Sequence, residues 1–272
     1  MNRRFRTRSA LGMLVLSVAF SAMLGCDSMS LSRARGAKSL LALFKPPTPG
    51  EAVDMALDKY DADQRYRGTA LLANVPYGGE DPYLKLFVDA AQDPDSGVRQ
   101  VGVRALGIHG GPEHVPLIVE RLTDDEWLVR MEAARALQRL HNDAAIGPLI
   151  DRVDPEKEIQ AAVRAEAADA LGQYREPRVL QALIAALNDP SLAVNHNTAT
   201  ALEILTGQDL GYEPAEWLAW LKTTDDPFKA GRLYTYPGFQ RDKLWYEYLP
   251  FVAPPPLEAE SVPVGLQPRF DS

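Results

Sequence analysis

Hydrophobic and small residues recur every three or four positions between residues 93 and 207, in segments that are themselves repeated along the chain. The clearest segment, 98–107, reads Val-Arg-Gln-Val-Gly-Val-Arg-Ala-Leu-Gly, and similar segments begin at Val129, Val163 and Val194. The leading valines are thus almost evenly spaced along the chain. Apolar residues at this local spacing form one face of an amphipathic helix. A repeat of about 30 residues with two helical segments is typical of an α-solenoid, in which neighbouring units share one core.

Each repeat contains a turn, the helix that begins near the key valine, and a second apolar helix. The turns are filled by Asp93-Pro94-Asp95, Asp124-Asp125 and Asn188-Asp189-Pro190. Asp and Asn are favourable N-caps because their side-chain oxygens accept orphan backbone N–H groups, and Pro suits the first helical turn. The second helices are expected at residues 113–122, 144–153, 178–187 and 214–221.

Small or apolar residues occupy one face of the first helix in each repeat. They follow the key valine at four or five, seven and eight positions: Gly102, Ala105 and Leu106; Ala133, Ala136 and Leu137; Ala167, Ala170 and Leu171; Ala199, Ala201 and Leu202. Small side chains let neighbouring helices approach closely, while the leucine fills the seam. A degenerate earlier copy spans residues 51–92 and places Arg65 one repeat before Arg99. The pattern therefore predicts an all-α, right-handed α-solenoid of about five helical hairpins over residues 49–222.

The repeated segments resemble the HEAT-like repeats associated with the phycobilisome-lyase family, whose unit carries Asp before the helix, then Val-Arg, then Ala-Ala-x-Ala-Leu-Gly. The resemblance covers roughly residues 60–222 and implies a ladder of Asp and Arg side chains along the stack. The residues that match the ladder positions, or lie near them, are Asp95, Arg99, Asp125, Arg130, Arg164 and Asp189. A partly exposed pair contributes ~0.2–1 kcal/mol, so the ladder is expected to set register more than bulk stability. Asn195 replaces the arginine in the last copy, which predicts that the array ends there.

The charge balance argues against nucleic acid as a partner. The formal net charge is −8, and residues 1–25 contain four arginines and no acidic residue. Without them the chain has 25 basic and 37 acidic residues, a net charge of about −12. Binding to a phosphate backbone needs clustered Lys and Arg. The lone cysteine, Cys26, excludes an internal disulfide and a cysteine-based metal cage.

The N-terminal segment is expected to direct the protein out of the cytoplasm. Residues 1–9 are basic, and residues 10–24 form an apolar run that has the length of a signal-peptide core. The run ends in Met23-Leu24-Gly25-Cys26-Asp27, which resembles the lipobox of bacterial lipoproteins, with Met23 at the usual Leu position. The resemblance implies that residues 1–25 are a signal peptide and that Cys26 carries lipid such as palmitate. This predicts a protein anchored on the periplasmic or outer face of an envelope membrane. An ordinary secretory signal or an uncleaved anchor is the alternative.

Two flanking segments each have two interpretations. Residues 26–48 combine basic and apolar residues, and form either a flexible tether or an amphipathic segment on anionic lipid. The aromatic, then Pro-rich tail spans residues 223–272, and residues 223–252 hold eight of the chain's 22 aromatic residues. This tail either folds back along the solenoid or docks on a partner. Trp217 and Trp220 share one helical face, and either cap the core or form a binding patch.

Motifs of known catalytic chemistry are missing from the sequence. It contains no P-loop, no G-x-S-x-G and no H-E-x-x-H, so we expect no enzyme and no cofactor. His109-Gly110-Gly111-Pro112-Glu113-His114 contains metal-ligand residue types, but Gly-Gly-Pro is an ordinary inter-helix turn. Carboxylate pairs such as Asp124-Asp125 lie at turns, where N-capping explains them.

The sequence therefore favours a membrane-anchored scaffold that binds another, unknown envelope protein. In HEAT-like stacks the Val-Arg helices line the concave face, which implies binding residues two and six positions after each valine. The candidate residues on the helices are Gln100, Arg104, Met131, Arg135, Ala165, Asp169, His196 and Thr200, and those in the tail are Trp245, Tyr246 and Tyr248. The alternatives are a structural spacer, or a small-ligand or lyase/isomerase-type protein. The last of these would need a deep pocket, which five short repeats rarely form.

Overall fold

The computed structural model describes residues 47–238, 242–244, 248 and 259–267. Contacts within the chain divide it into Met1–Pro47 and Thr48–Ser272, and every described helix lies in the second unit. The expected signal peptide and Cys26 lie outside the described residues. Among the residues that are described, no helix combines the length and the apolar character needed to cross a membrane.

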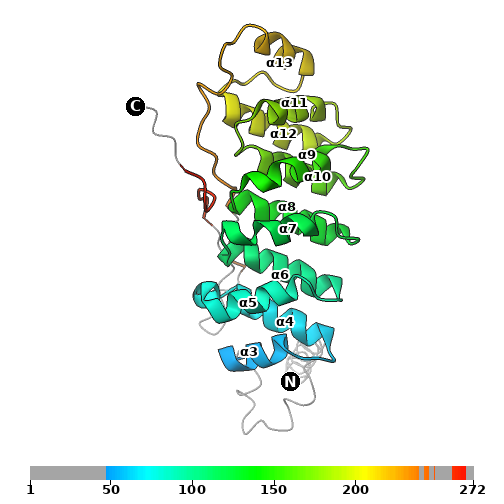
Figure 1. Cartoon of the computed structure of the whole chain (residues 1–272), viewed down its shortest axis with the longest axis vertical. Coiled ribbons are helices and arrows are strands. Elements are labelled where there is room, and N and C mark those ends of the chain that lie inside the picture. Colours follow the sequence, from blue (N-terminus) through cyan, green and yellow to red (C-terminus); the bar gives the residue numbers. More distant parts are fainter. Residues whose placement is uncertain (1–46, 239–241, 245–247, 249–258, 268–272) are drawn as a thin grey trace, which may run out of the picture. The chain divides into compact units, whose positions relative to one another are not determined.

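The described part of the second unit is a stack of α-helices in sequence order (Figure 1). The helices are α3 (Pro49–Ala56), α4 (Ala62–Ala73), α5 (Asp81–Ala90), α6 (Ser96–His109), α7 (Val115–Arg121), α8 (Trp127–Arg139), α9 (Ile146–Val153), α10 (Ala161–Leu171), α11 (Pro177–Ala186), α12 (Leu192–Thr206) and α13 (Pro214–Leu221). Short 3₁₀ helices precede α5, α7 and α9: η2 (Pro76–Gly79), η3 (Pro112–His114) and η4 (Asp143–Ala145).

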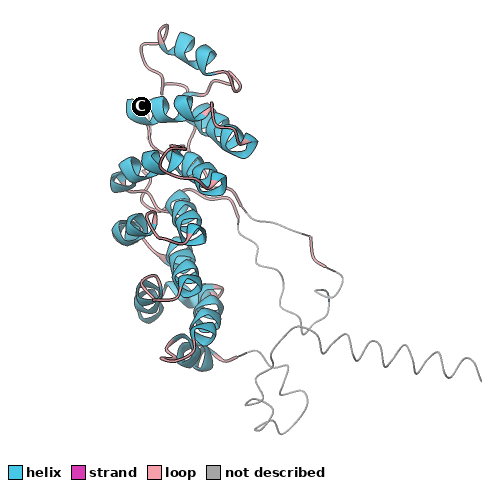
Figure 2. Ribbon diagram, turned by 90° about the vertical axis from the view of Figure 1, so that its right-hand side faces the viewer, coloured by secondary structure: helices cyan, strands magenta, loops and turns pink. Residues whose placement is uncertain are grey.

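In sequence the helices form five hairpins, α4–α5 to α12–α13, and α3 packs on α4 (Figure 2). The second helices α5, α7, α9 and α11 pack mainly on the first helix of the next hairpin. The first helices pack on one another in the order α4, α6, α8, α10 and α12, and the second helices α9, α11 and α13 do the same. The prediction of an all-α solenoid of about five hairpins is confirmed. Within the described residues, the extended structure consists of two isolated bridges, Leu140 with Val264 and Tyr236 with Ser261, both of which involve the tail.

Local side-chain chemistry explains where the helices start. The Asp95 side chain accepts a hydrogen bond from the backbone N–H of Val98 (3.1 Å) and so caps α6. Thr48 and Glu51 form a capping box at the start of α3. Proline occupies the first turn of α5, α11 and α13, where its missing N–H costs nothing.

Close helix packing depends on the small residues that recur with the repeat. A Cβ atom added to Gly102 would lie 2.4 Å from the backbone nitrogen of Ala91, at the C-terminal end of α5. A Cβ atom added to Gly107 would lie 2.8 Å from the Cβ atom of Ala136 on α8. Ala105 and Ala136 are completely or almost completely buried. These positions therefore need small side chains because α6 approaches its neighbours too closely for larger ones.

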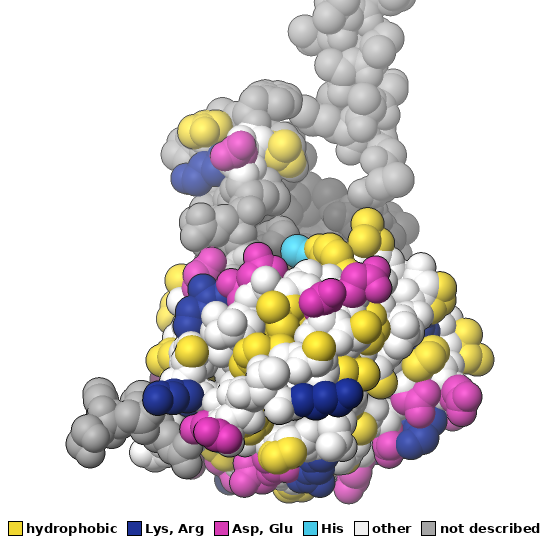
Figure 3. Space-filling model, turned by 90° about the horizontal axis from the view of Figure 1, so that it is seen from above, with side chains coloured by type: hydrophobic (Ala, Val, Ile, Leu, Met, Phe, Trp, Pro, Cys, Tyr) yellow, Lys and Arg dark blue, Asp and Glu magenta, His cyan; other side chains and the backbone are white. Residues whose placement is uncertain are grey.

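The last hairpin closes one end of the core. Trp217 is buried, donates its indole N–H to the carbonyl oxygen of Gly211 (3.0 Å), and meets Trp220 edge to face. Leu218 of the same helix is exposed, and Figure 3 shows hydrophobic side chains among charged ones over this end of the stack. Trp217 therefore acts as a core residue, in line with the interpretation of this helix as a cap.

Candidate functional site

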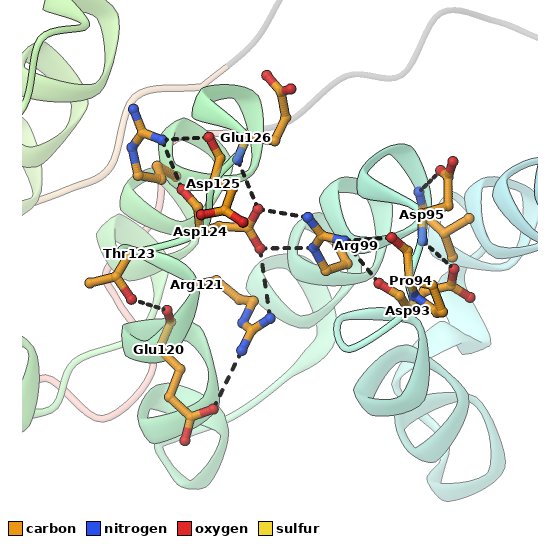
Figure 4. A network of polar contacts seen from close by, with 12 residues as sticks. Asp93, Pro94, Asp95, Arg99, Glu120, Arg121, Thr123, Asp124, Asp125 and Glu126 are labelled. Atoms are coloured by element: carbon orange, nitrogen blue, oxygen red, sulfur yellow. Dashed lines mark hydrogen bonds and ion pairs between the residues drawn. The ribbon is translucent and has the colours of Figure 1, made fainter.

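Arginines that follow the key valines link successive repeats. The Nε and Nη2 atoms of Arg99 donate to the two carboxylate oxygens of Asp124 (2.8 Å each), as Figure 4 shows. Its Nη1 atom donates to the carbonyl oxygens of Asp93 (3.0 Å) and Pro94 (2.9 Å). One guanidinium thus ties the turn of its own repeat to the turn of the next one, and the bidentate geometry fixes their register.

The same arrangement recurs along the stack. The further pairs are Arg65 with Asp93, Arg130 with Glu158 and Arg164 with Asp189. Each of these guanidiniums also donates to a backbone carbonyl oxygen in the turn before its helix. Arg121 reaches Asp124 as well (3.7 Å), and its neighbour Glu120 accepts from Thr123 (Figure 4). The ladder is a structural network that holds the repeats in order.

Two expected members of the ladder are wrong. Arg99, Arg130, Arg164 and Asp189 lie on it, but Asp95 and Asp125 do not. The Asp95 carboxylate is occupied in capping α6, and Asp125 contributes its backbone carbonyl oxygen, to Arg130 (3.2 Å).

The carboxylates on the ladder share one sequence position. They stand five residues before each key valine: Asp93, Asp124, Glu158 and Asp189. The five-residue spacing could have identified these acids from the sequence. The resemblance to a repeat with Asp before its helix pointed to Asp95 and Asp125 instead. In the longer turn before α10, the position is held by Glu158 and not by Asp154.

The ladder stops at the last repeat. Asn195 stands at the arginine position, and its buried Oδ1 atom has no hydrogen-bond partner among the described residues. Asp226 begins the next turn, and its side chain accepts from the backbone N–H of Phe228 (3.0 Å), as Asp93 does from Asp95 (2.8 Å). The Asp turn therefore occurs once more after the last ladder arginine. The arginine that would pair with it is replaced by Asn195, at the end of the stack.

A mixed-charge surface lies on α6, α8 and α10. Arg104 is exposed, and Arg135 pairs with Glu166 (Nη2 to Oε1, 2.7 Å). Gln138 also donates to Glu166 (2.8 Å). Burial raises the pKa of Glu132, and the nearby Arg135 and Arg104 oppose that rise. Positive and negative groups are therefore interleaved here, which suits a protein partner better than a polyanion.

The predicted binding residues divide by exposure. Arg104, His196 and Thr200 are exposed, whereas Gln100, Met131 and Arg135 are half-buried. Ala165 is buried (6% exposed), so its expected place on a solvent-facing surface is wrong. Trp245 and Tyr246 lie outside the described residues, and Tyr248 is exposed.

The described parts of the tail fold back over the first helices. We call residues 231–236 and 261–266 the strap. The backbone N–H of Arg232 donates to Ile204 at the end of α12 (2.7 Å), and the Arg139 guanidinium lies over the Tyr236 ring. Val264 donates to the carbonyl oxygen of Arg139 (2.8 Å) and accepts from the N–H of His141 (2.9 Å). The sequence left open whether the tail folds back along the solenoid or docks on a partner. These described residues fold back along the solenoid.

The strap covers one predicted binding residue. The Tyr234 hydroxyl, which is buried, donates to Oδ1 of Asp169 (2.9 Å). The contact joins residues 65 positions apart in the sequence. Asp169 therefore contacts the chain's own tail, and its assignment to a partner-binding surface is wrong.

Replacing Asp169 with asparagine is expected to change how stability depends on pH. Burial raises the pKa of Asp169 from 3.8 to about 6, although the hydrogen bond from Tyr234 opposes the shift. Between these values the folded protein holds a proton that the unfolded chain has released, so stability falls as pH rises. D169N lacks this contribution, so its free energy of unfolding should rise relative to that of the wild type between about pH 4 and about pH 7. The rise should be at most about 3 kcal/mol. Urea denaturation across this range measures the difference, and a difference that stays constant with pH would contradict the assignment.

The strap and the helix ends enclose a half-open pocket of about 660 Å³. Its floor is formed by the loops that follow α8 and α10, and two of its walls are strap residues 231–234 and residues 266–267. His141, Arg175 and Tyr174 line it, together with the apolar side chains of Leu233 and Leu266. We expected no such pocket from five short repeats, and the tail supplies the walls that the repeats lack.

The histidines near the Gly-Gly-Pro turn serve the fold. His109 bonds the carbonyl oxygen of Ala73 through Nε2 (2.8 Å), and His114 accepts the N–H of Gly111 through Nδ1 (3.1 Å). Among the described residues, no group of three or more His, Cys, Asp or Glu side chains could hold a metal ion.

Stacked helical hairpins joined by an arginine–carboxylate ladder define an α-solenoid. Comparison with protein families identifies the kind of repeat. The model for HEAT repeats matches residues 84–164 and 157–228. The chain belongs to the HEAT-repeat family, which confirms this part of the resemblance stated from the sequence.

Curated relatives and a solved structure show similarity over parts of the chain. Deoxyhypusine hydroxylase of Homo sapiens is 33% identical over 107 residues (39% of this chain and 35% of that protein), and the Danio rerio protein is 32% identical over 96 residues (35% and 31%). The chain thus spans about a third of the length of these relatives. The complex of CpcE and CpcF of phycocyanin lyase from Nostoc sp. PCC7120 contains a similar fold (TM-score 0.50, 21% identity, 70% of this chain and 74% of that chain).

These comparisons correct the expectation that the chain is not an enzyme. Relatives that match it bear the name of an enzyme, deoxyhypusine hydroxylase. That expectation depended on the absence of familiar catalytic motifs, and the similarity to proteins that bear an enzyme's name overturns it.

Proposed function

We propose that this HEAT-repeat protein is a lipid-anchored scaffold of the cell envelope that holds a partner protein on the surface of α6 and α8. The observation that carries the proposal is the interleaved charge around Arg104 and the Arg135–Glu166 pair. Arg104 is exposed, whereas Asp169 further along the stack is in contact with the strap. The uncovered side of this surface suits a partner with charges of both signs.

The proposed anchor rests on the N-terminal sequence. Cys26 is the single cysteine of the chain and directly follows a basic segment and an apolar run. Acyl chains on this residue would hold the protein on the membrane, since each buried methylene contributes about 0.8 kcal/mol. A partner captured by the array would then be kept at the envelope surface.

Crosslinking and pull-down from membranes tests the proposal. The double variant Arg104→Glu with Arg135→Glu should lower partner recovery about tenfold, because it reverses two charges of the interface. Arg178→Glu is the matched control, since Arg178 is an exposed arginine on α11 (56% exposed) that pairs with nearby Glu176. Cys26→Ala should release the protein from the membrane fraction and abolish incorporation of labelled palmitate. Equal recovery with the double variant and the control would reject the α6–α8 surface.

A further inference from the structure

The pocket beneath the strap has a positive group that no described carboxylate neutralises. Arg175 lines the pocket and donates through Nη2 to the carbonyl oxygens of Gly231 (3.1 Å) and Arg232 (3.2 Å). Both acceptors are neutral, so within the described residues its charge has no carboxylate partner. The ladder arginines, by contrast, each hold a carboxylate. The strap carbonyls therefore fix the guanidinium in place and leave its charge available to an anion.

His141 adds a second fixed polar group. The side-chain nitrogen of Gln173 donates to the carbonyl oxygens of Leu137 (2.8 Å) and Ala170 (3.1 Å), which turns the Gln173 oxygen toward Nδ1 of His141 (2.9 Å). Because that oxygen only accepts, Nδ1 must carry the hydrogen. The ring also stacks on Tyr174 at 4.9 Å. Nε2 is thus left as a hydrogen-bond acceptor, which suits a donor group of a ligand.

The acidic side chains of the pocket are engaged elsewhere or exposed to solvent. Glu176 pairs with Arg178 (2.5 Å). Asp143 lies 3.8 Å from Nε2 of His141, and its side chain is 81% exposed. Arg232, the other arginine in the described lining, is neutralised by Glu203 (2.6 Å). Among the described lining residues, Arg175 is therefore the arginine without a carboxylate partner, and the acid nearest to His141, Asp143, extends into solvent.

Two leucines of the strap supply the accessible apolar side chains of the lining. Leu233 is exposed and Leu266 is half-buried, whereas Ile146, Tyr174 and Tyr234 border the pocket but are almost completely buried. A volume of about 660 Å³ falls in the range of small-molecule sites, which combine apolar walls with a few placed polar groups.

We infer that this pocket binds a small organic carboxylate with a hydrophobic body. The carboxylate would meet Arg175, and the body would lie against Leu233 and Leu266. The site needs both the array and the strap, because neither encloses the pocket alone. It is separate from the proposed partner surface on α6 and α8.

Titration calorimetry of the full-length protein with phenylbutyrate and with its neutral isostere phenylbutyramide tests the inference. The acid should bind at least about tenfold more tightly than the amide, because only the acid forms a charge-assisted pair with Arg175. Arg175→Gln should remove this preference, whereas Lys157→Gln, which changes an exposed cation that does not line the pocket, should keep it. Leu233→Trp should fill the pocket without touching Arg175 and should abolish binding.

Using both Arg175→Gln and Leu233→Trp distinguishes a loss of binding from a loss of folding. If Arg175→Gln loosens the strap and lowers the unfolding temperature, Leu233→Trp still decides, because Leu233 is partly exposed and tolerates a larger side chain. Equal affinity for acid and amide, unchanged binding by both variants, or no binding of the acid to the wild type would each overturn the inference.

Discussion

Replacing Arg164 with methionine is expected to lower the free energy of unfolding by about 3–5 kcal/mol. Arg164 and Asp189 form the most buried rung of the ladder, with side chains 6% and 1% exposed. The guanidinium also donates to the carbonyl oxygens of Glu158 (2.9 Å) and Ile159 (2.8 Å). The variant therefore leaves a buried carboxylate without its counter-charge and two carbonyl groups without a donor.

Equilibrium denaturation in urea measures this effect. Arg178→Met is the control, because its pair with Glu176 is exposed and should cost at most about 0.5 kcal/mol. Adding Asp189→Asn to Arg164→Met should restore part of the loss, since the amide removes the buried charge and its oxygen can still accept from Ser191. A loss below about 1 kcal/mol for Arg164→Met would mean that the rung sets register only.

Replacing Trp217 with alanine is expected to cost about 3–5 kcal/mol. The indole is buried at the end of the core, contacts Trp220 and bonds Gly211. A terminal hairpin has one neighbour only, so the variant should detach α13 and expose the part of α11 on which it packs. Hydrogen exchange should accelerate in these helices before it does so in α6 or α8.

The control and the competing interpretation are both available on the same helix. Leu218→Ala removes an exposed side chain and should leave the stability within about 0.5 kcal/mol of the wild type. If Trp217→Ala kept full stability but lost partner capture in the crosslinking experiment, α13 would be a binding patch and not a cap.

The sequence pattern predicted the arginines of the ladder but not all of the acids. Arg99, Arg130 and Arg164 follow from the repeat, because each stands next to a key valine on a helix of known phase. The carboxylate that each one pairs with lies 25 or 28 residues away, in a turn with several acids. Whether Asp93 or Asp95 faces the arginine depends on how the turn folds against the next repeat, so two of the expected acids were wrong.

The strap and the pocket could not be predicted from the sequence, for a different reason. The tail has no helical periodicity, so nothing in it specifies where it contacts the array. The bond between Tyr234 and Asp169 joins distant segments, and the available charge of Arg175 appears only once the carbonyl groups of Gly231 and Arg232 lie beside it. Exposure of Asp169 and Ala165 was misjudged because helix phase does not reveal what covers a face.

The sequence by itself determined the all-α repeat architecture, the positions of its helices and the residues that must be small. These features follow from local periodicity and from repetition, since each unit meets neighbours of the same kind. The tertiary structure decided which acids complete the ladder, where the tail lies and that a pocket exists. These depend on contacts between segments that do not repeat, and their free energy depends on three-dimensional proximity that no local pattern encodes.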